Sequence, residues 1–148
     1  MGVEIRESPV SDEAFDAMRE FVHDYLAASV ENEEGGGRMR WYPWHSAEYR
    51  FNHILNVVDI ATTIAEREGA NVDVTRVAAL FHDIAKLEAE QDVHAEAGAR
   101  IAREYLATHG DYPESFVEQV YRSVEDHSYQ GDLSNLSLET QCLIEADI

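Results

Sequence analysis

The sequence predicts an all-α fold, a bundle of about six helices, from three observations. Apolar side chains recur every three or four residues along most of the chain, and no alternating run of strand length appears. Capping residues and glycines bound the periodic segments. The chain has 148 residues, 45% of them apolar, so it is long enough to bury a core. We expect one domain over 1–148, with a first helix and an aromatic loop in 1–45 and the core in 46–148.

The first two predicted helices lie on either side of a glycine-rich loop. The first covers 11–30, with Ser11 as its N-cap and acidic residues in its first turn. Its apolar face consists of Phe15, Met18, Val22 and Leu26. Three glycines at 35–37 interrupt the pattern. The second helix covers 46–68, from an N-cap at Ser46 to a stop at Gly69. Its expected buried residues are Ile54, Val57, Val58, Ala61, Ile64 and Ala65.

Further helices complete the expected bundle, and a capping or turn residue places most of them. Asp73 is predicted to cap a helix over 74–86, and Asp92 to cap one over 93–109 that stops at Gly110. Pro113 is expected in the first turn of a helix over 114–127. A last helix is predicted over 137–148. Residues 128–135 are predicted to form a loop.

The acidic composition limits the classes of partner. Thirty acidic residues oppose eleven basic ones, for a formal net charge of −19, and they are spread along the chain. Concentrated salt screens the self-repulsion of such a surface, so we expect a salt-adapted cytoplasmic protein. Binding to duplex nucleic acid, which needs a basic surface, is disfavoured. No apolar run reaches the length of a membrane span, no signal peptide is apparent, and the lone Cys142 indicates a buried thiol in a reducing compartment.

Histidines and aspartates lie inside apolar segments of the predicted helices. His82 and Asp83 are adjacent in VAALFHDIA, His53 lies near the start of an apolar helix, and Asp147 lies in CLIEADI. Taken singly, each is better explained as a core histidine or as a capping or hydrogen-bonded aspartate. Together they favour a nitrogen–oxygen site for a divalent transition metal such as Mn, Fe, Ni or Co. Because helical neighbours point about 100° apart, His82 and Asp83 reach one ion only at a helix edge that faces a cavity.

Three motifs resemble those of the HD-domain superfamily of metal-dependent phosphohydrolases. They are the spacing of Arg50 and His53, the segment LFHDIAK ending at Lys86, and the pair Ala146–Asp147. The similarity runs from about Arg50 to Asp147, roughly two-thirds of the chain. It implies a helical bundle with the metal held between helices, in agreement with the all-α prediction.

The resemblance also implies roles for His94, in HAEAGA, and for His127, at the end of YRSVEDH. A histidine falls in each region in the binuclear branches of the superfamily, which include symmetrical dinucleoside-tetraphosphate hydrolases and cyclic-dinucleotide phosphodiesterases. The implied ligand sets, bridged by Asp83, are His53, His82, Asp83 and Asp147 for one ion and Asp83, His94 and His127 for the other. The alternative is that His94 is a first-turn surface residue and His127 a cap at a helix C-terminus.

Two cations lie near the expected ligands. Lys86, the only lysine, follows Asp83 by three residues, so a continuous helix would place both on one face. A cation there is suited to hold a phosphate oxygen or to offset transition-state charge. Arg50 lies one turn before His53 and is suited to bind a phosphate in a forked arrangement. For both cations, the alternative is a salt bridge to one of the many acids.

The aromatic residues around the first ligand have two open interpretations. They either stack on a nucleobase or close a lid over the site, or they cover the core. The residues concerned are Trp41, Tyr42, Trp44, Tyr49 and Phe51. The remaining histidines, expected at surface or capping positions, are His23, His45 and His109.

The residues and the resemblance together imply a metal-dependent phosphohydrolase acting on a small phosphorylated molecule, with nucleotides as the first expectation. It would use one or two divalent ions (Fe, Mn, Ni, Co or Zn), with Asp83, Lys86 and Arg50 as catalytic residues and the two cations also binding substrate. An HD-type di-iron oxygenase and a non-catalytic nucleotide-binding module are the alternatives. Asp147 is the second-last residue, so its position needs support from bound metal or from a longer chain.

Overall fold

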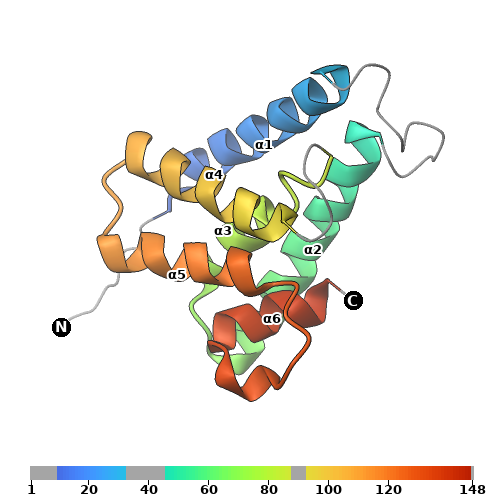
Figure 1. Cartoon of the computed structure of the whole chain (residues 1–148). Helices are drawn as coiled ribbons and strands as arrows, with labels where there is room; N and C mark the ends of the chain where they lie inside the picture. Colours follow the sequence, from blue (N-terminus) through green and yellow to red (C-terminus); the bar gives the residue numbers. More distant parts are fainter. Residues whose placement is uncertain (1–9, 33–45, 88–92, 148) are drawn as a thin grey trace.

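The computed structural model describes residues 10–32, 46–87 and 93–147 and shows helices without strands in these ranges (Figure 1). This confirms the predicted all-α class. The α-helices are α1 (Asp12–Asn32), α2 (Ala47–Glu68), α3 (Val72–Phe81), α4 (His94–Thr108), α5 (Glu114–Asp126) and α6 (Leu138–Ala146). A 3₁₀ helix, η3 (Leu133–Asn135), lies in the connection expected to be a loop.

Helix α3 is the centre of the bundle and packs against each of the other five helices. It carries buried residues along most of its length, from Val74 to Phe81, because its sequence is apolar on nearly every side. Helices α4 and α5 lie side by side, while α1 covers α2 and α3 (Figure 1). This arrangement brings the C-terminal end of α3 into the middle of the molecule, where several helix ends meet.

The expected caps and apolar faces of the first two helices are confirmed. The hydroxyl oxygen of Ser11 accepts a hydrogen bond from Ala14 N at 3.0 Å, and that of Ser46 accepts one from Tyr49 N at 2.9 Å. Gly69 ends α2 with φ of 77°, a left-handed conformation that favours glycine. Among the expected core positions, Met18, Val22, Leu26, Ile54, Val57, Val58, Ala61 and Ala65 are buried, while Phe15 and Ile64 pack against the core half-buried.

The predicted bounds of α3 are wrong at both ends. Asn71, not Asp73, is the N-cap, because its side-chain oxygen accepts a hydrogen bond from Val74 N at 3.1 Å. Asp73 instead pairs with Arg76, with a nitrogen–oxygen distance of 3.1 Å. At the other end the helix stops at Phe81, five residues before the predicted end, so the expected helical face shared by Asp83 and Lys86 does not exist.

Several sequence predictions fall outside the described residues. They are the glycines at 35–37, the aromatic residues Trp41, Tyr42 and Trp44, His45, and the proposed cap Asp92. Pro113 is the N-cap residue of α5 rather than part of its first turn, and the last helix ends at Ala146, with Asp147 as its C-cap. Among the described helices, none combines the length and the apolar character needed to cross a membrane.

Candidate metal centre

The chain leaves α3 through a tight turn that carries His82 and Asp83. Hydrogen bonds three residues apart replace the helical pattern, with Ile84 N donating to Phe81 O at 3.1 Å and Lys86 N to Asp83 O at 2.9 Å. Such bonds wind the backbone more tightly than an α-helix and change the relative direction of successive side chains. His82 is fully buried and Asp83 is 3% exposed, so both need polar partners inside the protein.

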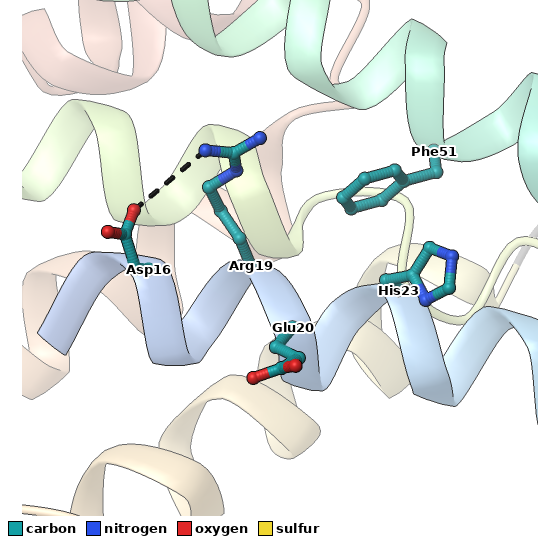
Figure 2. Close-up of a pocket in the computed structure, with 5 residues that line it drawn as sticks. All are labelled: Asp16, Arg19, Glu20, His23 and Phe51. Carbon is teal, nitrogen blue, oxygen red and sulfur yellow. Dashed lines mark ion pairs between the residues drawn. The ribbon is translucent and has the colours of Figure 1, made fainter. Parts of the chain in front are cut away.

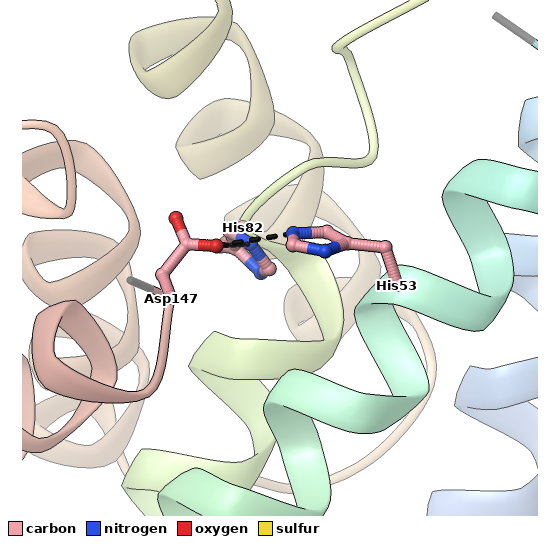
Figure 3. Close-up of side chains that lie close together, drawn as sticks. All are labelled: His53, His82 and Asp147. Carbon is pink, nitrogen blue, oxygen red and sulfur yellow. Dashed lines mark hydrogen bonds and ion pairs between the residues drawn. The ribbon is translucent and has the colours of Figure 1, made fainter. Parts of the chain in front are cut away.

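Two histidines and a carboxylate meet at the first of two sites, which we call the outer group (His53, His82 and Asp147). The imidazole Nε2 of His53 lies 3.1 Å from Asp147 Oδ1, and that of His82 lies 3.4 Å from the same oxygen. Figure 3 shows His53 pointing from α2 toward the Asp147 carboxylate at the end of α6, with His82 beside them. One ligand atom from each residue lies within 4.8 Å of the others, a spacing that suits a metal ion.

The second site, the inner group (Asp83, His94 and His127), consists of buried side chains. His94 begins α4 and His127 follows α5, and their Nε2 atoms lie 3.3 Å apart. Both nitrogens approach Asp83 Oδ1, at 3.6 Å from His94 and 3.8 Å from His127. Since His94 is only 2% exposed, the alternative that it is a surface residue is wrong.

Asp83 joins the two groups because its two carboxylate oxygens face different ways. Oδ1 is the oxygen that faces the inner group, whereas Oδ2 lies 3.4 Å from His82 Nε2 and 3.6 Å from His53 Nε2. A carboxylate in this position is able to bridge two cations, one on each oxygen. The six residues expected as ligands are therefore all brought together around Asp83.

Helix ends supply a second feature that favours cations. His82, His127 and Asp147 are the C-cap residues of α3, α5 and α6, so three helices direct their C-terminal ends at the site. The C-terminal end of a helix carries a partial negative charge. In addition, Nδ1 of His82 donates to Ala79 O and Nδ1 of His127 donates to Val124 O, both at 2.6 Å. These bonds fix the rings and leave each Nε2 facing the site, an arrangement that is common for metal-bound histidines. Sequence reasoning missed these two backbone carbonyls, since nothing in a residue type marks them.

The charges of the site are strongly coupled. Burial alone would lower the pKa of His82, but the carboxylates of Asp83 and Asp147 outweigh it and raise the pKa to about 9. Burial and the nearby His82 lower the pKa of His127 to about 4. Burial opposes ionisation of Asp83, yet His82 and other hydrogen-bonding and cationic neighbours hold its pKa well below the usual range. The hydrogen bond from His53 and the nearby His82 likewise lower the pKa of Asp147 against the effect of burial.

The residues fit a pair of divalent metal ions. His82 Nε2 is buried without a hydrogen-bond partner of good geometry, although its ring is held firmly by the Ala79 carbonyl. A polar atom in that condition is costly unless something binds it. Each group offers two imidazole nitrogens and a carboxylate oxygen, a donor set that suits Mn, Fe, Co, Ni or Zn.

Comparison with known families shows which family this chain belongs to. The family model of the HD domain matches residues 50–148, which begins just before the first outer-group ligand and includes all six. The chain belongs to the HD-domain family.

Relatives of this HD domain have varied names. It is 29% identical over 90 residues to a tRNA (cytidine(56)-2′-O)-methyltransferase of Thermoplasma volcanium, covering 61% of this chain and 24% of that protein. It is 27% identical over 67 residues to a symmetrical bis(5′-nucleosyl)-tetraphosphatase of Halalkalibacterium halodurans, covering 45% of this chain and 36% of that protein. This chain thus spans only about a quarter and about a third of these two curated relatives.

A solved structure supports the fold of this HD domain. The crystal structure of a predicted HD superfamily hydrolase from an uncultured Thermotogales bacterium superposes with a TM-score of 0.63. The two chains are 28% identical, and the match covers 86% of this chain and 65% of that one. The similarity therefore extends beyond the residues matched by the family model and includes part of the N-terminal region.

The two cations of the HD motif have different surroundings. Arg50 NH1 lies 3.2 Å from Asp83 Oδ2, so the arginine contacts the bridging carboxylate directly. Its side chain is 12% exposed, and its Nε is buried without a hydrogen-bond partner. Lys86 is half-buried in the turn after α3, and its ammonium forms no ion pair with the described part of the chain. Arg50 therefore forms the salt bridge that the alternative interpretation expected, and its partner, Asp83, is a candidate ligand.

Two histidines without an expected role, His23 and His109, have ordinary positions. His109 is the C-cap residue of α4 and its ring stacks on Tyr105, with ring centroids 4.0 Å apart. His23 is exposed on α1 and lies edge-on to Phe51, with centroids 5.1 Å apart. His127 is a helix cap, as its alternative interpretation proposed, and is also a member of the inner group.

An open groove of about 400 Å³ lies between α1 and α2, apart from the ligand groups. Figure 2 shows its lining of Asp16, Arg19, Glu20 and His23 from α1 and Phe51 from α2. Phe51 also packs against the core, in line with the interpretation of the aromatic residues as core cover. Tyr49, by contrast, is half exposed beside Arg50.

Proposed function

We propose that this HD domain is a metal-dependent phosphohydrolase that cleaves a phosphate ester or anhydride of a small molecule, a nucleotide in the first instance. The observation that carries the proposal is the pair of three-residue groups that share Asp83, with one carboxylate oxygen facing each group. Two ions held so close together suit an in-line phosphoryl displacement.

The proposed ligands divide between two ions. The outer ion would take His53, His82, Asp83 and Asp147, and the inner ion would take Asp83, His94 and His127. When bound, divalent ions supply activation of water near neutral pH and neutralisation of phosphate charge. The backbone carbonyls that fix the rings of His82 and His127 would keep each Nε2 directed toward a bound ion.

The accessible side of the site is the outer group. The side chains of His53 and Asp147 are 32% and 24% exposed, whereas the inner group is closed to solvent. A substrate phosphate therefore approaches on the outer side. Arg50 lies there beside Asp83 and is proposed to donate two hydrogen bonds to the phosphate, while Lys86 provides a second cation.

The nucleotide substrate has support from one relative. The matching protein of Halalkalibacterium halodurans is named for the symmetrical cleavage of bis(5′-nucleosyl) tetraphosphates. Such molecules have the phosphoanhydride bonds that a pair of cations is suited to cleave. We therefore place nucleoside polyphosphates at the head of a substrate panel, followed by mononucleotides and model phosphate esters.

The test is hydrolysis by protein reconstituted with Mn, Fe, Co or Ni, with release of phosphate or nucleotide as the measurement. We expect activity that depends on added metal and disappears in Asp83→Ala, while His109→Ala, at the far end of α4, leaves it unchanged. Protein that holds two ions per chain but is inactive across the whole panel would contradict the proposal.

We further propose that the protein works in the cytoplasm of a salt-adapted cell, with the net charge of −19 as support. Screening of acidic repulsion predicts a melting temperature that rises as KCl increases from about 0.1 M to about 2 M. A melting temperature that is constant or falls over that range would contradict the salt adaptation.

A further inference from the structure

The first turn of α6 is joined to α5 by a chain of three hydroxyl groups. Thr140 Oγ1 lies 2.9 Å from Ser123 Oγ on α5 and 2.7 Å from Ser137 Oγ, the N-cap of α6. Ser137 Oγ also accepts a hydrogen bond from Thr140 N at 3.1 Å. Thr140 is 1% exposed and Ser123 is fully buried, so the bond between them is shielded from water. In such surroundings a hydroxyl hydrogen bond is directional and costly to lose.

The positions of these hydroxyls relate them to the candidate ligands. Ser123 precedes His127 by one helical turn, so the two share a face of α5. Thr140 precedes Asp147 by seven residues, which is two turns, so these two share a face of α6. The Ser123–Thr140 bond therefore connects the faces of two helices that each end in a candidate ligand, one from each group.

Helix α6 is short, and it combines apolar packing, through buried Leu143 and Ala146, with polar bonds at its first turn. It has nine residues, and Asp147 is its C-cap and the last residue described. A second bond at its start, from Asn71 N to Glu139 Oε2 at 2.7 Å, ties the same turn to the N-terminus of α3. Asp147 thus stands at the C-terminal end of a short helix whose first turn is fixed by polar bonds and whose apolar face packs in the core. A small rotation about that first turn moves the carboxylate, and ligand geometry tolerates little displacement.

We propose that Thr140 is a positioning residue that holds Asp147 in the outer group through its buried hydrogen bond to Ser123. The proposal rests on the proposed function in taking Asp147 as a metal ligand. It predicts that loss of the Thr140 hydroxyl weakens binding of the outer ion selectively, because the inner group is held by α4, α5 and the turn after α3.

The experiment compares metal affinities of wild type, Thr140→Val and Thr140→Ser, measured with Co²⁺ by competition with a coloured chelator and by the absorption spectrum of the bound ion. Thr140→Val keeps the side-chain shape and removes the hydroxyl. We expect it to weaken outer-ion binding about three- to tenfold, below the roughly 10- to 100-fold typical of groups bonded directly to a ligand. Thr140→Ser restores the hydroxyl and is expected to restore the affinity.

Two controls separate positioning from general loss of stability. Thr75→Val removes an equally buried hydroxyl, whose 2.9 Å bond to the N-cap carbonyl Asn71 O does not leave the start of α3, and it should lower the melting temperature without changing either affinity. In a His53→Ala background, which isolates the inner ion, Thr140→Val should have no effect on affinity.

A second variant tests the same hydrogen bond even if Thr140→Val fails to fold. Ser123→Ala removes the other partner of the same bond, so it should weaken outer-ion binding by a similar factor, and the double variant should be no worse than either single one. Unchanged outer-ion affinity in both single variants, or equal losses at the two ions, would overturn the inference. A wild type that binds fewer than two ions would instead refute the binuclear proposal itself.

Discussion

The two halves of the site use the same donor types in different surroundings. The outer group places His53 and Asp147 at the surface, with side chains 32% and 24% exposed, and only His82 is fully buried. The inner group has no comparable exposure. Buried polar clusters are tolerated when something satisfies them, and they become rigid in return. The inner group is therefore suited to hold an ion permanently, whereas the outer group is suited to meet a substrate.

The two groups also differ in the proton they carry. The raised pKa of His82, about 9, keeps its imidazole protonated at neutral pH between two carboxylates. The lowered pKa of His127, about 4, keeps that imidazole neutral over the same range. A metal needs the unprotonated nitrogen. His127 is therefore ready to bind an ion at neutral pH, whereas His82 must first release a proton.

The largest effect is expected from Asp83→Asn, which removes the carboxylate charge that the two groups share and so affects both of them. We expect both ions to be lost and hydrolysis to fall by about 10³-fold or more, since metal ions contribute several kcal/mol to the transition state. Metal content and steady-state rates measure this. Retention of two tightly bound ions would contradict the bridging role, and circular dichroism serves as the control for folding.

The next effect separates the groups by stability. His127→Ala leaves a cavity and unpaired polar atoms in the inner group, so we expect the metal-free protein to lose about 2–3 kcal/mol of unfolding free energy. His53→Ala changes a partly exposed side chain, so its loss is expected to stay below about 1 kcal/mol. Urea unfolding in the presence of chelator measures both values. Equal losses would show that the two groups do not differ in the way proposed.

The third prediction concerns pH. Below the His82 pKa of about 9, the affinity for the outer ion should fall about tenfold for each unit by which the pH is lowered, because binding displaces one proton. His127, with its pKa of about 4, adds no such dependence to the inner ion at neutral pH. Proton release in a weakly buffered titration at about pH 8 measures the difference. Release that accompanies the inner ion alone would contradict the assignment.

The same pKa values fix the pH dependence of the metal-free fold. The raised pKa of His82 gives stability that is fully present below pH 6.5 and is lost as the pH rises through about 9. The lowered pKa of His127 makes the fold lose stability as the pH falls from 6.5 toward about 4. Thermal unfolding in chelator should thus be most resistant near pH 6.5, and His82→Ala should remove the alkaline loss.

The smallest effects are expected on the substrate side of the outer group. Arg50→Gln should raise KM for a phosphorylated substrate at least roughly tenfold, because charged hydrogen bonds to the phosphate are lost, with two ions still bound. Lys86→Gln should raise KM by only about threefold, because Lys86 lies in the turn after α3 and not on a helical face shared with Asp83. Steady-state kinetics at saturating metal measure both, and unchanged KM values would remove these residues from phosphate binding.

The sequence was sufficient for local features of the fold. Helical periodicity placed the buried faces of α1 and α2, and side-chain capping by Ser11 and Ser46 follows from residue type. The resemblance to the HD superfamily supplied His94 and His127, whereas His53, His82, Asp83 and Asp147 stand out as polar residues inside apolar segments. These features depend on neighbours within a few residues, which is the range that sequence patterns describe.

Features that depend on distant contacts could not be predicted in this way. Asn71 displaced Asp73 as the cap of α3, and its backbone N–H is bonded to Glu139, 68 residues away. The end of α3 at Phe81 puts Asp83 in a turn where its two oxygens face separate groups, which no helical wheel represents. Ser123 and Thr140 gave only a faint signal, as hydroxyl residues at helical spacing from the candidate ligands His127 and Asp147.

Anomalous diffraction from crystals grown with Mn²⁺ tests the binuclear centre most directly. We expect two peaks per chain on opposite sides of the Asp83 carboxylate, about 3.5–4 Å apart, as in other two-metal sites. The outer peak should contact His53, His82 and Asp147, and the inner peak should contact His94 and His127. A single peak at full occupancy, or peaks away from Asp83, would contradict the proposed centre.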